Sequence, residues 1–228
     1  MTTWIKIART HLVGGMNYLA YPWLILGLNF FIANAISGAL SGQNNFYSGE
    51  VFAIYAAFLA MGVASVIRWL PFTLALGVSR RDYFIGISFL ALGVSALDGL
   101  VLALLQILER LTGGWGSSLH FFRVPYIFGG PWYLTWLTSF VLLTVAFVWG
   151  VWFGIVYKRW NLFGLLTFIS LQVIAPTLGV IAVTQAHAWK SIGHFFTTLS
   201  IEGLTGLLAV LAVLLLAGGL STIRRVTV

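Results

Sequence analysis

Six long runs of apolar residues constrain this chain more than any other feature of its sequence. A helix needs about 20 apolar residues to cross the roughly 30 Å hydrocarbon core of a bilayer. The runs cover residues 21–40, 51–67, 84–108, 132–157, 162–184 and 201–220. They lack the alternation of apolar and polar residues that is typical of membrane barrel strands. We therefore predict an all-α, polytopic integral membrane protein with six transmembrane helices in a single transmembrane domain.

The charge content excludes other classes of protein. Only 7% of the 228 residues are charged, namely 12 Lys and Arg and 5 Asp and Glu. A soluble domain usually carries about 25% charged residues, and disordered segments are poor in apolar residues, so neither class fits. The chain has no cysteine. A disulfide scaffold, a thiol nucleophile and a zinc–thiolate site are therefore excluded.

Lysine and arginine orient the predicted helices, because these residues are enriched in cytoplasmic loops. With a cytosolic N-terminus, three of them lie outside, at Arg110, Arg123 and Lys190. The other nine lie inside, at Lys6, Arg9, Arg68, Arg80, Arg81, Lys158, Arg159, Arg224 and Arg225. Both termini are thus predicted to be cytosolic. The net charge of +7 then indicates contact with anionic lipid head groups or an acidic cytosolic partner, and no nucleic acid partner is expected.

The segment before the first run, residues 3–19, is predicted to be an amphipathic helix in the membrane interface. Lys6 and Arg9 lie opposite an apolar side that includes Trp4 and Leu12. A cationic side opposite a Trp/Leu side is typical of interfacial helices. The alternative is an irregular extension of the first span. A cleaved signal peptide is not expected, because the stretch is long for the apolar region of such a peptide.

Asp98 is the ionisable residue that lies well inside a predicted span, and Glu202 begins the sixth. Burying a carboxylate in a membrane is costly, so a carboxylate found there is by default a candidate functional residue. Asp98 is a candidate proton relay, substrate contact or partner of a cation such as Arg110. The alternative is a structural, hydrogen-bonded group.

Sites of enzymatic or metal chemistry are not apparent in the sequence. The four histidines include no pair at the i, i+4 spacing of a helical metal site, and we predict no metal site and no catalytic residue. Neither a G-x-S-x-G nucleophile elbow nor a G-x-x-x-x-G-K-[ST] phosphate loop occurs. We therefore expect no enzyme and no bound cofactor in this chain. Any ATP hydrolysis would belong to another chain.

The first predicted cytosolic loop, residues 68–83, contains signals for a short helix. Pro71 suits the first position of a helix and Gly77 the position just past its end. Ser79 followed by Asp82 predicts a capping box at the start of the third span. A rigid short helix between two spans suits a lever that docks on a cytosolic protein. The alternative is a tight loop whose arginines only obey the charge rule.

The pattern Pro-x5-Gly-x-Ser-Arg-Arg-x-Tyr-x-x-Gly, from Pro71 to Gly86, resembles the first cytosolic loop of permease subunits of ATP-binding-cassette (ABC) exporters. More specifically, it resembles small six-span permeases of the bacterial type-2 exporter family, often found in actinobacteria. Residues 113–126 and 149–160 are similar to the same group. Together with the predicted spans, the resemblance covers nearly the whole chain.

The resemblance implies a permease that pairs with a second copy or a paralogue in the bacterial cell membrane. Two cytosolic ATPase subunits would bind ATP and Mg²⁺ and drive transport. Residues 71–81 would be the coupling helix that inserts into the ATPase, and residues 185–200 would hold a re-entrant segment. The coupling residues would be Pro71, Phe72, Leu76, Gly77, Val78, Ser79, Arg80 and Arg81.

The exported substrate would be hydrophobic or amphipathic, such as a drug or antibiotic, a lipid or a peptide. Candidate residues of the path are Asp98, Phe30, Phe31 and Phe58. The outer loop, residues 109–131, is rich in aromatic residues and is predicted to be a folded cap. The alternative function is a stand-alone secondary carrier or channel that uses Asp98. An intramembrane enzyme is a third class, but no nucleophile–base pair supports it.

Overall fold

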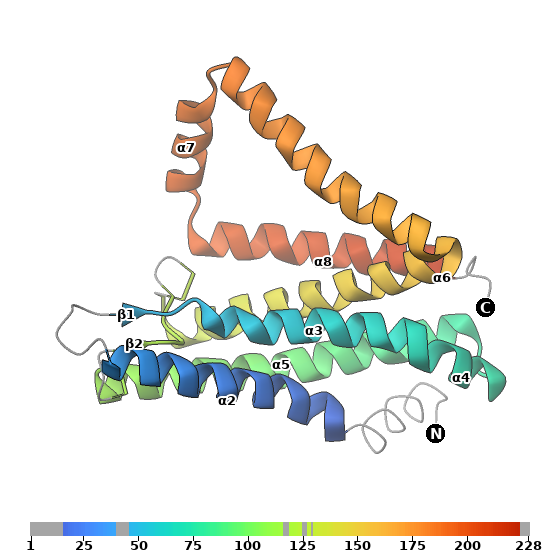
Figure 1. Cartoon of the computed structure of the whole chain (residues 1–228), viewed down its shortest axis with the longest axis horizontal. Coiled ribbons are helices and arrows are strands. Elements are labelled where there is room, and N and C mark those ends of the chain that lie inside the picture. Colours follow the sequence, from blue (N-terminus) through green and yellow to red (C-terminus); the bar gives the residue numbers. More distant parts are fainter. Residues whose placement is uncertain (1–15, 40–45, 116–118, 125–126, 129, 224–228) are drawn as a thin grey trace.

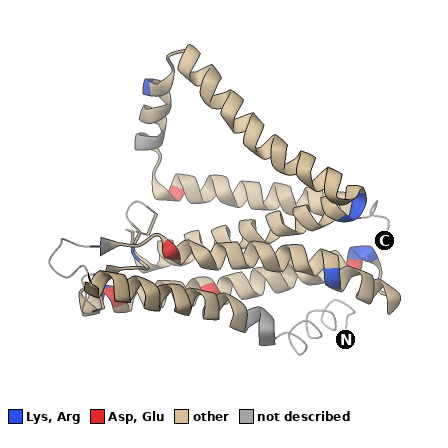
Figure 2. Cartoon of the chain, viewed as in Figure 1, with Lys and Arg blue, Asp and Glu red and all other residues tan. Residues whose placement is uncertain are grey.

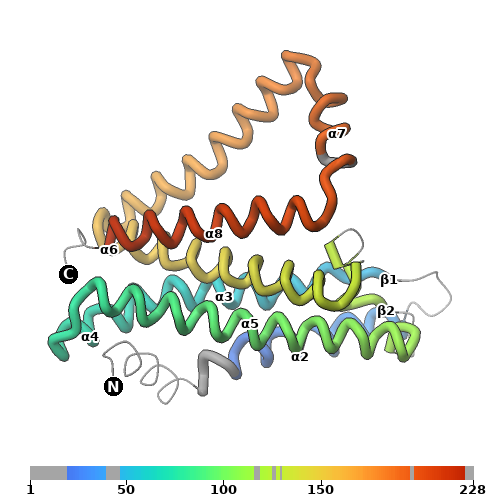
Figure 3. The backbone as a smooth tube through the Cα atoms, turned by 180° about the vertical axis from the view of Figure 1, so that it is seen from behind, coloured from blue at the N-terminus to red at the C-terminus, as the bar shows by residue number. Residues whose placement is uncertain are grey.

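The structure is a computed structural model that describes residues 16–39, 46–115, 119–124, 127–128 and 130–223, most of them helical. Most of the long helices lie lengthwise beside one another in a bundle, and a splayed arm rises from one end of this bundle (Figures 1 and 3). In chain order the elements are α2 (Met16–Ala39), β1 (Phe46–Tyr47), η1 (Glu50–Phe52), α3 (Ala53–Ala64), η2 (Ser65–Trp69), α4 (Leu70–Ala75), α5 (Arg80–Thr112), β2 (Leu119–His120), α6 (Trp132–Gln185), α7 (Trp189–Thr198) and α8 (Ile201–Ile223).

Five of these helical stretches are long and apolar enough to cross a membrane, at residues 20–39, 50–75, 80–112, 132–185 and 201–223. The first three and the last match predicted runs. The fourth and fifth predicted runs both fall within the 54 residues of α6. The prediction of a multi-pass, largely helical membrane protein therefore agrees with the structure at this level.

A sharp bend at Asn161 divides α6 into two arms. Asn161 has φ 54° and ψ −152°, which no helix contains. Residues 132–160 pack in the bundle, whereas residues 162–185 diverge from it (Figure 1). At 1.5 Å per residue the arms are about 43 and 36 Å long. The predicted connection between the fourth and fifth runs is thus reduced to a turn centred on one residue.

The second arm of α6 makes few contacts within the chain. Its side chains are almost all exposed, and Phe163 reaches 86%. The short helix α7 joins the far end of this arm to α8, so that the three segments form a triangle (Figure 1). Helix α7 lies where we expected a re-entrant segment at residues 185–200, but its relation to a membrane stays a prediction.

Glycines bring α3 and the first arm of α6 into direct backbone contact. A Cβ atom added at Gly62 would collide with the carbonyl oxygen of Phe147, and one at Gly150 with that of Leu59. At Gly154 it would lie 2.6 Å from Cβ of Val66. Small residues four apart allow membrane helices to approach this closely. We call this contact the glycine seam.

Some predicted boundaries differ from the structure. Helix α2 begins at Met16, inside the segment predicted as an interfacial helix, and residues 3–15 of that prediction lie outside the described residues. Helix α5 continues to Thr112, one turn into the predicted outer loop. The structure also contains a short parallel pairing of β1 with β2, which an all-α prediction omits. It forms because the amide of Ser48 also donates to the carbonyl of His120, joining the two loops.

Candidate functional site

The predicted coupling segment forms a short helix with a well-defined end. Helix α4 has Pro71 in its first turn and ends before Gly77, whose φ is 80°. The amide of Gly77 donates to the carbonyl of Leu74 and that of Val78 to the carbonyl of Thr73, at 2.9 and 3.2 Å. This is the Schellman pattern, in which glycine supplies the left-handed residue. The prediction of a short helix that ends at Gly77 is confirmed.

The predicted cap of the next helix is also present. The Ser79 hydroxyl accepts the amide of Asp82 at 3.1 Å and donates to its carboxylate at 2.7 Å. Asp82 also places a negative charge in the first turn of α5, where the helix dipole favours it. The turn between α4 and α5 is therefore fixed at both ends.

We expected α4 to be a separate short helix. Instead it continues the preceding helical stretch without a break. The π-helical turn η2, which contains Arg68, joins α3 to α4. In this turn the carbonyl of Ser65 accepts the amide of Leu70, five residues on, and also the hydroxyl of the fully buried Tyr83 at 2.6 Å. A π turn widens the helix, and Tyr83 of α5 ties the widened point to the neighbouring helix.

The outward side of α4 is apolar. Phe72 and Leu76, one turn apart, are 52% and 65% exposed, while Leu70 and Thr73 face the bundle. Of the other predicted coupling residues, Gly77, Ser79 and Arg81 are exposed, whereas Pro71, Val78 and Arg80 are half-buried. The structure thus brings all eight predicted residues together around one turn.

Basic residues gather at the end of the molecule that carries this turn. Figure 2 shows positions of basic residues clustered on the ribbon at the end of the bundle with α4 and the α6 bend. The described basic residues at the α4 end are Arg68, Arg80, Arg81, Lys158 and Arg159. An excess of Lys and Arg at one end of the helices is the asymmetry from which the orientation of a membrane protein is predicted.

Asp98 lies inside the bundle, on α5, and is 4% exposed. The indole N–H of Trp23 on α2 donates to its Oδ1 at 3.1 Å, and Oδ2 has no hydrogen-bond partner. Arg110, the cation that we considered as its partner, lies about 18 Å further along α5 and donates to the carbonyl of Gly130 instead. The expected pair is therefore not formed.

The predicted aromatic path residues differ in their surroundings. Phe31 is 70% exposed on the outside of α2, whereas Phe58 is fully buried in α3. Phe30 contacts the rings of Trp115 and Phe121 at 5.1 and 5.4 Å, in the outer cap. These three phenylalanines do not line one common surface.

The outer cap is organised around Glu109, which sequence analysis did not single out. Its Oε2 accepts the indole N–H of Trp115 and the amides of Phe121 and Phe122, at 3.1, 3.0 and 2.7 Å. Its Oε1 accepts the amide of Arg123 at 3.2 Å. The only sign in the sequence was an acidic residue at the start of an aromatic loop. The described residues of this loop thus fold around one carboxylate, and their place as a cap on the outer side of a membrane stays a prediction.

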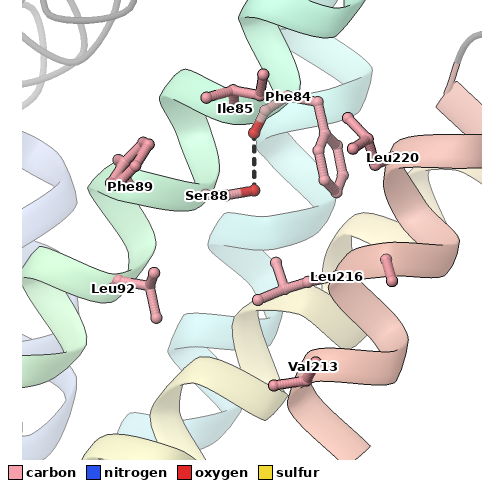
Figure 4. Close-up of a pocket in the computed structure, with 9 residues that line it drawn as sticks. Phe84, Ile85, Ser88, Phe89, Leu92, Val213, Leu216 and Leu220 are labelled. Atoms are coloured by element: carbon pink, nitrogen blue, oxygen red, sulfur yellow. Dashed lines mark hydrogen bonds between the residues drawn. The ribbon is translucent and has the colours of Figure 1, made fainter.

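An apolar groove of about 370 Å³ opens between α5 and α8, near the α4 end. Figure 4 shows its lining, in which the Ser88 hydroxyl is turned back to the carbonyl of Phe84. The groove therefore presents no free polar group and suits an acyl chain or another apolar molecule. It is lined by Phe84, Ile85, Ser88, Phe89, Leu92, Val213, Leu216, Ala217 and Leu220.

No group of three or more acidic or histidine side chains among the described residues is arranged to hold a metal ion. Comparison with known proteins adds no further identification: no family model, curated protein or solved structure matches this chain.

Proposed function

We propose that this chain is the permease subunit of an ATP-driven exporter, coupled through α4 to separate cytosolic ATPase subunits. The observation that carries the proposal is the hydrogen-bonded turn between α4 and α5. It combines the Schellman end at Gly77, the Ser79 cap and the Tyr83–Ser65 hydrogen bond. A force applied to the exposed Phe72 and Leu76 would therefore pass into α5 without being absorbed by a loose loop.

The proposed topology has six crossings, with the two arms of α6 as the fourth and fifth. Each arm exceeds the roughly 30 Å that a bilayer core requires. The basic end of the bundle would face the cytosol, which places both termini there in a bacterial cell membrane. A second copy or a paralogue would complete the transport unit and cover part of the exposed second arm.

The proposed substrate is hydrophobic or amphipathic, such as a drug, a lipid or a peptide. The groove between α5 and α8 supports this class, because its lining is apolar and adjoins the helix that α4 would move. The different surroundings of Phe30, Phe31 and Phe58 remove the reason to propose them as one binding surface.

Co-purification with an ATPase tests the proposal. Tagged chain isolated from its native membrane in mild detergent is expected to bring an ATPase with it in about equal amount. Phe72→Glu combined with Leu76→Glu should abolish this association. Leu111→Glu is the control, because Leu111 is also an exposed apolar residue but lies at the other end of α5. A chain that purifies without any nucleotide-hydrolysing partner would refute the proposal.

A second candidate is a stand-alone carrier, and the buried Asp98 favours it. Ion-coupled carriers use intramembrane carboxylates of this kind. The purified chain in liposomes would then transport without ATP, and Asp98→Asn would stop transport. An exporter driven by ATP would keep its coupling in the same variant.

A further inference from the structure

The carboxylate of Asp98 has an unusual environment for a charged group. One oxygen accepts the Trp23 indole, the other has no hydrogen-bond partner, and the side chain is almost fully buried. Among the described residues, no Lys, Arg or His forms an ion pair with it. A buried, unpaired carboxylate costs several kcal/mol unless something compensates its charge.

Further buried oxygens without hydrogen-bond partners occur on α5 and on the helices packed in the same bundle. Ser95 is fully buried, lies three residues before Asp98 on the same side of α5, and its hydroxyl has no partner. Side chains three residues apart on a helix have Cβ atoms about 5–6 Å from each other. This spacing allows two oxygens to bind one small ion rather than each other.

Helix α6 brings a second set of hydroxyls to the same level. A Cβ added at Gly99 would lie 3.1 Å from the amide nitrogen of Phe140, so the backbones of α5 and α6 touch there. Asp98 directly precedes Gly99 in the sequence, and Ser139 directly precedes Phe140. The hydroxyl of Ser139, 1% exposed, lies close enough to that of Tyr55 on α3 to interact with it, although neither meets the distance and angle of a hydrogen bond.

We propose that Asp98, Ser95, Ser139 and Tyr55 form a binding site for a monovalent alkali cation such as Na⁺. Hard cations prefer oxygen ligands, and these four residues offer a carboxylate and three hydroxyls. A single carboxylate balances a single positive charge. The Trp23 indole holds one carboxylate oxygen and leaves the other for the ion. The inference rests on neither transport proposal, because a resident ion would be bound whatever drives transport.

Thermal unfolding of the purified full chain in detergent tests the site, with Trp fluorescence as the signal. The chain is compared in sodium chloride and in choline chloride at equal ionic strength. At a sodium concentration a hundred times its Kd, we expect the Tm to rise by about 5 °C. Asp98→Asn should abolish this response, and Ser139→Ala should weaken the apparent affinity about tenfold. Glu202→Gln, at the exposed start of α8, should retain the full response.

Two results would overturn the inference. One is an equal Tm in sodium, lithium, potassium and choline, as expected if Asp98 is a neutral, protonated acid. The other is a sodium response that persists in Asp98→Asn. If that variant does not fold, binding of radioactive sodium to the unmodified chain and to Ser139→Ala decides the question. Bound sodium that is weakened by Ser139→Ala supports the site, and absence of binding to the unmodified chain refutes it.

Discussion

The hydroxyl of Tyr83 donates a 2.6 Å hydrogen bond to the carbonyl oxygen of Ser65, eighteen residues earlier in the chain. The same oxygen accepts the amide of Leu70 in the π turn. Tyr83 therefore stabilises the point at which the second spanning helix passes into α4. Because Tyr83 belongs to the first turn of α5, this bond links the two helices that flank the proposed coupling turn.

Tyr83→Phe removes this bond and leaves the ring in place. We expect a loss of about 0.5–1.5 kcal/mol in the free energy of unfolding, since the Ser65 oxygen keeps its bond to Leu70. Thermal or denaturant unfolding in detergent measures the change. Tyr133→Phe is the control, because Tyr133 is 56% exposed, and it should have no measurable effect. Equal stability of the two variants would show that the Tyr83 bond does not hold the turn.

Gly77→Val should disturb the end of α4. Gly77 has φ 80°, and a β-branched residue pays roughly 1–2 kcal/mol or more to adopt the left-handed region. Space is not the cause, because nothing lies within 4 Å of an added Cβ. Gly77→Asn should be tolerated, since asparagine enters this region readily. Stimulation of the ATPase in the purified complex should fall in the Gly77→Val variant and persist in the Gly77→Asn variant. Greater stimulation in Gly77→Val than in Gly77→Asn would contradict the assigned turn.

Gly150→Ala should separate α3 from the first arm of α6. The added methyl group would meet the Leu59 carbonyl, and overpacking of this kind costs about 1–3 kcal/mol or more. Gly93→Ala provides the contrast, because Gly93 lies in α5 with nothing within 4 Å of an added Cβ. That control should stabilise the helix by about 0.5–1 kcal/mol. Thermal unfolding of both variants should therefore shift in opposite directions.

Glu109→Gln should loosen the outer cap. The carboxylate accepts three backbone amides and one indole, and an amide side chain offers only one acceptor oxygen. At least one buried donor would then be unsatisfied, at a cost of about 1–3 kcal/mol. Fluorescence of Trp115 and protease cleavage within residues 113–130 should report the change. Glu202→Gln, which alters an exposed carboxylate, should leave both signals as they are.

Sequence reasoning succeeded where the signal is local. The cap at Ser79 and the helix end at Gly77 follow from residues three to six positions apart, so the sequence contains all that forms them. The run lengths likewise predicted the helices that are long and apolar enough to cross a membrane, although two of the six runs form the single helix α6. The glycine seam also has a local sign in the sequence, because Gly150 and Gly154 are four residues apart and small residues at this spacing are typical of closely packed helices.

The remaining features depend on partners distant in the sequence. The π turn needs Tyr83 from the next helix, and Glu109 binds amides 12 to 14 residues away. Phe31 and Phe58 belong to helices that are apolar on all sides, so periodicity cannot tell which side faces the core. The bend at Asn161 has a positive φ with ψ −152°, which lies outside the left-handed helical region that asparagine often adopts, so the residue type gives no sign of it.

The glycine seam also limits how the molecule can move. Each of its carbonyls lies against a glycine of the other helix, so sliding by one helical turn would drive side chains into the backbone. Helix α3 and residues 132–160 must therefore rotate or tilt as one rigid body. The second arm of α6 has no such interlock: it meets the first arm through side chains, in the hydrogen bond of Trp149 to Gln172 and the ring contact of Phe153 with Phe168. In any conformational change the hinge is thus expected at Asn161, and the packing across the glycine seam is expected to stay the same.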